Sequence, residues 1–113
     1  MGVFNGIFPI IAGKEADARA FAAETIGPRL KEFEALQARS SITRETWALQ
    51  ETPMGSFMVV WFEGNVEEGF GDLATNTSDF AQWFRGQVLG LTGVDMSQPP
   101  DGPLPDVLVD WSA

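Results

Sequence analysis

The sequence predicts an α+β domain with elements in the order strand, helix, strand, strand, helix, strand. Three observations predict this order. Residues 56–62 form a short apolar run of strand length, while residues 14–39 are rich in Ala, Glu, Leu and Arg, which favour helix. Pro53-Met54-Gly55 separates two extended runs and is typical of a hairpin turn. With 113 residues, 44% of them hydrophobic, the chain fits one domain over residues 1–113.

The first strand is expected over residues 3–12, which are rich in Phe and Ile. Pro9 lies within this segment, and proline suits an extended segment on a sheet better than the interior of a helix. Most side chains on both sides of the segment are apolar. Gly13 is expected to end the strand.

A helix is predicted over residues 14–39, with Ile26, Leu30 and Phe33 spaced as one buried face. Gly27-Pro28 interrupts this segment. Because proline lacks the N–H that a helix needs at that position, the sequence predicts either a kink there or a break into two helices.

The next two extended runs, residues 42–52 and 56–63, are predicted to form an antiparallel hairpin. A two-residue turn places Trp47 and Leu49 beside Met58, Val60 and Phe62, on the face under the helices. The opposite face then carries a mixture of polar and aromatic side chains, namely Arg44, Thr46, Ala48, Gln50, Phe57, Val59 and Trp61. A turn longer by one residue would exchange the two faces.

In the C-terminal half, residues 65–75 suggest a short helix, and Ser78 is suited to cap a longer one that Gly93 closes. Apolar side chains recur at helical spacing after Ser78, at Phe80, Trp83, Phe84, Val88 and Leu91. Residues 97–105 contain four prolines and are expected to run over the surface. Val107, Val109 and Trp111 alternate along the chain and predict a final strand.

This order of elements is the ferredoxin-like βαββαβ pattern with an antiparallel sheet. Its central strand is apolar on both faces, with Phe57 and Trp61 pointing one way and Met58 and Phe62 the other. The predicted helices supply only one covering layer. We therefore expect a second copy of the chain to cover the other face, which makes the protein a homodimer.

Composition excludes several functions. Sixteen Asp and Glu against seven Lys and Arg give a formal charge of −9, which disfavours nucleic acid and membrane surfaces as partners. The chain has no His, Cys or Tyr, so it lacks the residues of a His-based triad, a thiolate nucleophile or an ordinary zinc site. We expect no metal, no cofactor and a cytoplasmic location.

Residues 3–14, which lead into the long helix, and the hairpin residues 44–55 resemble those of the dimeric α+β barrel superfamily. The resemblance spans nearly the whole chain. The superfamily includes antibiotic-biosynthesis monooxygenases and stress-responsive barrel proteins, and the hairpin resembles that of an uncharacterised bacterial branch. The resemblance implies two four-stranded sheets packed face to face in a dimer, with a pocket between the sheet and helices of each protomer.

The cofactor-independent oxygenases of this superfamily hold a phenolic substrate with Asn, Trp, Arg and Tyr. By resemblance, this chain offers Asn5, Arg44 and either Trp47 or Trp61, but no Tyr. The haem-degrading members use an axial His that has no counterpart here.

Glu45 is the candidate for a general base, because burial beside Trp47 would raise its pKa. The alternative is an ordinary ion pair with an Arg. Trp61 and Trp47 are the aromatic candidates for ligand contact, although aromatic residues also dominate cores and interfaces.

Three polar residues are candidates on the predicted strands. Asn5 interrupts an apolar strand face, and a buried amide there orients either a ligand or a structural hydrogen bond. Arg44 could clamp a carboxylate or phenolate and Gln50 could donate from an amide, or both are simply exposed near the sheet edge.

Two hypotheses follow. In the first, the protein binds a small apolar or aromatic molecule and acts as a cofactor-independent oxygenase or isomerase. In the second, it is a non-catalytic dimerisation or stress-related module with no retained active site. Asn5, Arg44 or Glu45 converging on an aromatic wall would favour the first, while a cavity filled by Trp61 and Phe57 would favour the second.

Overall fold

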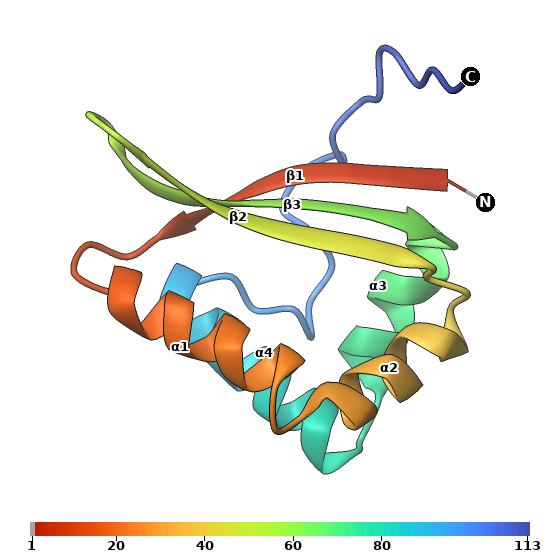
Figure 1. Cartoon of the computed structure of the whole chain (residues 1–113), viewed down its shortest axis with the longest axis horizontal. Helices are drawn as coiled ribbons and strands as arrows, with labels where there is room; N and C mark the ends of the chain where they lie inside the picture. Colours follow the sequence, from red (N-terminus) through yellow and green to blue (C-terminus); the bar gives the residue numbers. More distant parts are fainter. Residues whose placement is uncertain (1) are drawn as a thin grey trace.

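A computed structural model describes residues 2–113, which fold into an α+β arrangement of three strands and four helices (Figure 1). The elements in chain order are β1 (Gly2–Ile10), α1 (Glu15–Ile26), α2 (Leu30–Arg39), β2 (Arg44–Thr52), β3 (Gly55–Gly64), α3 (Val66–Thr75) and α4 (Asp79–Thr92). None of these helices has the length and apolar character needed to cross a bilayer.

The three strands form one antiparallel sheet in the order β1-β3-β2. All four helices lie on one face of the sheet, which we call the helix side (Figure 1). The other face has no helix over it within residues 2–113, and we call it the open face. This arrangement gives the two sides of each strand different environments.

The β2–β3 hairpin has the predicted register. Thr52 pairs with Gly55 across the two-residue turn Pro53-Met54, Trp47 pairs with Val60, and Leu49 pairs with Met58. Trp47, Leu49 and Met58 pack against the core on the helix side, as predicted. Gly55 has φ of 122°, a conformation that favours glycine and explains its place after the turn.

The predicted helix over residues 14–39 is two helices, because the chain breaks at Gly27-Pro28 between α1 and α2. Phe33 packs against the core, but Ile26 and Leu30 are exposed, so the predicted buried face through all three was wrong. The break changes the direction of the chain, and helical spacing does not carry a buried face across it. The buried residues of α1 are instead Ala18, Phe21 and Thr25.

Helix α4 begins and ends where the sequence predicts. The Ser78 hydroxyl accepts a 3.1 Å hydrogen bond from the Ala81 N–H, and Gly93 ends the helix with φ of 78°. The expected apolar positions of α4 lie in or against the core, with Phe80, Phe84 and Leu91 buried.

The predicted final strand is absent from the described chain. Residues 93–113 contain no helix or strand, and Val109 and Trp111 are 83% and 80% exposed. This C-terminal tail ends beyond the sheet, on the side of the open face (Figure 1). A strand needs a neighbouring backbone for its hydrogen bonds, and residues 2–113 of the single chain provide none along residues 107–111.

Candidate functional site

A pocket of about 110 Å³ lies between the sheet and the helices. Its lining is mostly apolar and comes from all three strands, from all four helices and from the segment after α4. The polar side chains in the lining include Gln37, Ser40 and Glu45. A concave apolar site with a few polar groups has the usual composition of a small-molecule site.

Two aromatic clusters contribute to the lining. In the first, Trp47 stacks on Phe21 with ring centroids 5.2 Å apart and meets the edges of neighbouring rings of α2 and α4. In the second, Phe4, Phe62 and Phe70 lie with centroids 4.9 to 5.6 Å apart. Such ring pairs stabilise a core beyond the burial of their area. Aromatic side chains of strands and helices therefore form much of the pocket wall.

The Glu45 carboxylate lies on the helix side of β2, partly buried against Trp47. Its Oε1 accepts a 2.7 Å hydrogen bond from Gln37 Nε2, and its Oε2 accepts a 2.5 Å hydrogen bond from Trp47 Nε1. Burial raises the pKa of Glu45 above its usual value, although the hydrogen bonds from Trp47 and Gln37 oppose that rise.

An ion pair was the alternative environment for Glu45. Among residues 2–113, no Lys or Arg lies within salt-bridge distance of its carboxylate, and both of its side-chain donors are neutral. Glu45 is thus a carboxyl with a raised pKa in an aromatic pocket, which is the kind of environment in which a carboxyl can act as a general base.

Ser40 is a second polar group of the pocket. The residue is 2% exposed, and its Oγ has no hydrogen-bond partner within residues 2–113. Most buried hydroxyls in folded proteins have a partner, so an unpaired one in a pocket lining is a place where a ligand group can bind.

Sequence reasoning missed Gln37 and Ser40. Phe33 and Gln37 lie at positions i and i+4 of α2, Ser40 is the residue at its C-terminal cap, and all three line the pocket. The spacing of Phe33 and Gln37 puts them on the same face of α2. The spacing of these residues was visible in the sequence, but it did not show that this side of the helix faces a pocket.

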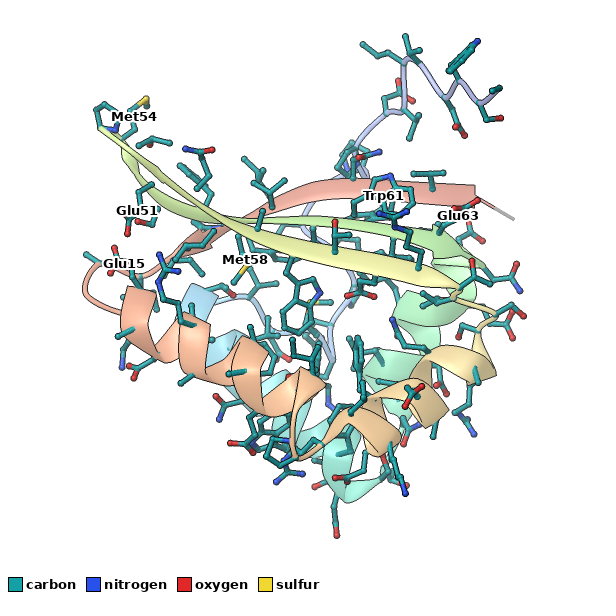
Figure 2. All side chains as sticks on the ribbon, in the orientation of Figure 1. Glu15, Glu51, Met54, Met58, Trp61 and Glu63 are labelled. Carbon is teal, nitrogen blue, oxygen red and sulfur yellow. The ribbon has the colours of Figure 1, made fainter. Side chains whose placement is uncertain are left out.

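The other predicted site residues lie on the open face, away from the pocket. Asn5 is directly opposite Trp61 in the β1–β3 register, and the Arg44 guanidinium lies 5.7 Å from the centre of the Trp61 ring. Figure 2 shows Trp61 on the open face and Met58 on the helix side of the same strand. Asn5, Arg44 and Trp61 therefore form one cluster, separated from Glu45 by the sheet.

Two expectations change as a result. Asn5 is exposed rather than buried, because no element of residues 2–113 covers the open face. Gln50 is also exposed, and its amide donates to the neighbouring Glu51 carbonyl oxygen at 3.1 Å. Of the six candidates, only Glu45 and Trp47 line the pocket.

No group of three or more Asp or Glu side chains in residues 2–113 is placed to hold a metal ion. Asp72 also borders the pocket, but its two carboxylate oxygens accept hydrogen bonds of 2.8 and 2.9 Å from Arg39. Asp72 is therefore already engaged by an arginine.

Comparisons of the chain with models of known protein families, with curated proteins and with solved structures find no match.

Proposed function

We propose that the protein binds a small, largely apolar or aromatic molecule in the pocket, and that Glu45 accepts a hydrogen bond or a proton from it. The observation that carries this proposal is the pairing of Glu45 with an aromatic lining. A carboxylate in such surroundings loses hydration, so its presence there is a cost to folding that ligand recognition would explain.

The size of the pocket limits the ligand to no more than about one ring. Its volume is about 110 Å³, and an apolar cavity of roughly 150 Å³ is known to hold benzene. A ring that carries a hydroxyl group suits both parts of the site. The aromatic walls would contact the ring, while Glu45 and the unpaired Ser40 Oγ would bind the hydroxyl group.

Proton transfer is the chemistry that this site supports best. A carboxyl with a raised pKa can remove a proton from one atom of a bound substrate and return it to another, which is an isomerisation that needs no further reactant. An oxygenase reaction, suggested by the resemblance to dimeric barrel monooxygenases, would also require O₂ as the oxidant. Of these two reactions we favour the isomerisation, because it needs no second reactant.

A second proposal concerns the open face. We propose that the chain forms a homodimer of the dimeric α+β barrel type, in which the open faces of two sheets meet. Ile7 is 63% exposed and Val59 39% exposed on this face, beside the Trp61 ring, so contact with a second copy would bury apolar side chains. If the pocket binds nothing, this face favours the alternative of a non-catalytic dimerisation module.

The binding proposal can be tested by titrating the protein with p-cresol or with toluene. Binding is monitored by ¹H–¹⁵N NMR of the four tryptophan indoles. The Trp47 indole N–H donates a hydrogen bond to the Glu45 carboxylate, so its resonance reports on the pocket. We expect p-cresol to shift that resonance in a saturable manner and toluene to bind less tightly, because toluene has no hydroxyl group for Glu45.

The matched variants are Glu45→Gln and, as a control, Glu63→Gln, which makes the same change at an exposed position on the open face. Glu45→Gln should reduce the preference for p-cresol over toluene, and Glu63→Gln should leave it unchanged. The proposal is overturned if p-cresol shifts the Trp61 indole instead, or if both variants keep the wild-type preference.

A further inference from the structure

The outer edge of β1 lacks the features that usually protect an edge strand. β1 pairs only with β3, and none of its nine residues is charged. Proteins commonly protect exposed edges with charged side chains, because unpaired backbone groups attract other strands. The opposite edge strand, β2, carries Arg44, Glu45 and Glu51. On β1 only Pro9, near the end of the strand, lacks a backbone N–H that could pair with another strand.

The C-terminal tail has the pattern of the strand that such an edge would accept. Val107, Val109 and Trp111 form one row of side chains, while the other row consists of Asp106, Leu108 and Asp110. Val109 and Trp111 are more than three quarters exposed in the single chain. A wholly apolar row beside a row that carries two acidic residues favours a strand that is buried mainly on one side.

The tail of each chain is directed away from its own sheet. The C-terminal end of α4 is fixed next to β1, because the Ile11 N–H donates a 2.8 Å hydrogen bond to the Leu91 carbonyl oxygen. From there the chain passes the sheet and ends beyond the open face (Figure 1). If a second copy lies against that face, the tail extends into the space that the second copy occupies.

We propose that residues 106–111 of each protomer add a fourth strand to the outer edge of β1 in a second copy of the chain. The proposal rests on the proposed homodimer and names the segment that joins its two halves. A two-fold axis makes the exchange reciprocal, so each chain gives one strand and receives one. Backbone hydrogen bonds would then satisfy both the edge of β1 and the tail.

The exchange would also connect the dimer to the pocket. Met96 lines the pocket and belongs to the segment that joins α4 to the tail. If the tail is held by the second copy, both ends of this segment are anchored, and Met96 stays in place at the pocket. Ligand binding and dimer formation should therefore strengthen each other.

A mixed-dimer NMR experiment tests the exchange directly. The chain has no cysteine, so an Ala113→Cys variant accepts one nitroxide spin label near Trp111. The spin-labelled variant, prepared without ¹⁵N, is mixed with ¹⁵N-labelled wild type. The broadening of the β1 amide signals of the wild-type chain is then measured. We expect the label on one chain to broaden the β1 amides of the other, while β2 amides are affected less.

The possible results separate the exchange from the homodimer. Broadening of β1 only when the spin label and ¹⁵N are on the same chain would mean that the strand pairs within one protomer, and would overturn the exchange. Stronger broadening of β2 would overturn the choice of edge. A dimer with neither effect keeps the homodimer and removes the exchange, whereas a monomeric protein removes both.

Two tail variants supply an independent measurement. Val109→Asp places a charge in the apolar row, and Leu108→Asp places the same charge in the row of Asp106 and Asp110, at a similarly exposed residue. We expect Val109→Asp to weaken the dimer roughly tenfold or more and Leu108→Asp to change it by less than about threefold. Equal effects of the two variants on the dissociation constant from sedimentation would contradict a strand with one buried row.

Discussion

The Trp47 indole N–H donates a 2.5 Å hydrogen bond to the Glu45 carboxylate, two residues earlier on the same face of β2. Residues i and i+2 of a strand point to the same side, so this pair depends only on the strand conformation of β2. Gln37 of α2 adds the second donor. The orientation of the carboxylate is therefore fixed by neutral groups before any ligand binds, while its protonation state remains free to change.

Glu45→Gln should change how stability depends on pH. Because the pKa of Glu45 is raised on folding, the unfolded chain loses this proton first, and the contribution of Glu45 is greatest below the ordinary Glu pKa of about 4.3. It falls as pH rises from there through the raised pKa, and is constant above it. As the pH rises through this range, the free energy of unfolding of the wild type should therefore fall relative to that of Glu45→Gln. The fall is about 1.4 kcal/mol for each unit by which folding raises the pKa.

Urea unfolding of both proteins between pH 4 and 8 measures this difference, because the other carboxylates titrate in both and cancel. Glu63→Gln serves as the control, since Glu63 is exposed. This variant removes the same negative charge outside the pocket, so it measures the effect of the charge change alone. Parallel profiles for wild type and Glu45→Gln would show that folding does not raise the pKa of Glu45.

Trp47→Phe should raise the pKa of Glu45 further, because it removes one of the two donors that stabilise the carboxylate. We expect a loss of about 1–3 kcal/mol in the free energy of unfolding, since a partly buried acceptor loses its partner. ¹³C NMR titration of the Glu45 carboxyl measures the pKa. Trp83→Phe is the control because the Trp83 ring contacts Arg29 and core aromatics, not Glu45. An equal pKa in both variants would contradict the prediction.

Ser40→Ala and Ser56→Ala should have opposite effects on stability. The Ser40 Oγ is buried without a partner in residues 2–113, so its removal should stabilise the protein by about 1 kcal/mol. The Ser56 Oγ donates a 3.0 Å hydrogen bond to Glu15, so its removal should cost about 1 kcal/mol. Chemical denaturation measures both changes. A cost for Ser40→Ala equal to that for Ser56→Ala would mean that the Ser40 hydroxyl has a bound partner.

Local features of the fold could be predicted because neighbouring residues determine them. The two-residue turn at Pro53-Met54 fixed the register of the hairpin, and with it the side of the sheet on which Glu45 and Trp47 lie. Ser78 and Gly93 marked the ends of α4 for reasons of capping and backbone conformation.

Features that depend on distant contacts could not be predicted in the same way. Spacing alone did not reveal that Ile26, the last residue of α1 before the break at Gly27, is exposed. Gln37 and Ser40 became pocket residues only because α2 packs over the end of β2 that carries Glu45. The exposure of Asn5 and the absence of a strand at residues 107–111 could not be predicted either. Both depend on whether another part of the protein covers the open face or pairs with the tail.

Trp61→Asp should dissociate the proposed homodimer. Trp61 lies on the open face, where its ring neighbours the exposed Asn5 and the Arg44 guanidinium. Buried tryptophans at interface centres contribute about 2 kcal/mol or more, and a carboxylate at that position would lose its hydration on association. Native mass spectrometry at low micromolar concentration reports the subunit number, and thermal unfolding reports stability.

A matched variant distinguishes an interface from a general effect of added charge. Leu89→Asp introduces the same group at an exposed position of α4, on the helix side of the molecule. We expect this variant to keep the wild-type subunit number, because the proposed interface lies on the other face of the sheet. Unchanged mass and melting of Trp61→Asp would refute an interface at this ring. Dissociation of both variants would instead indicate that the dimer responds to total charge, which is already −9 in the wild-type chain.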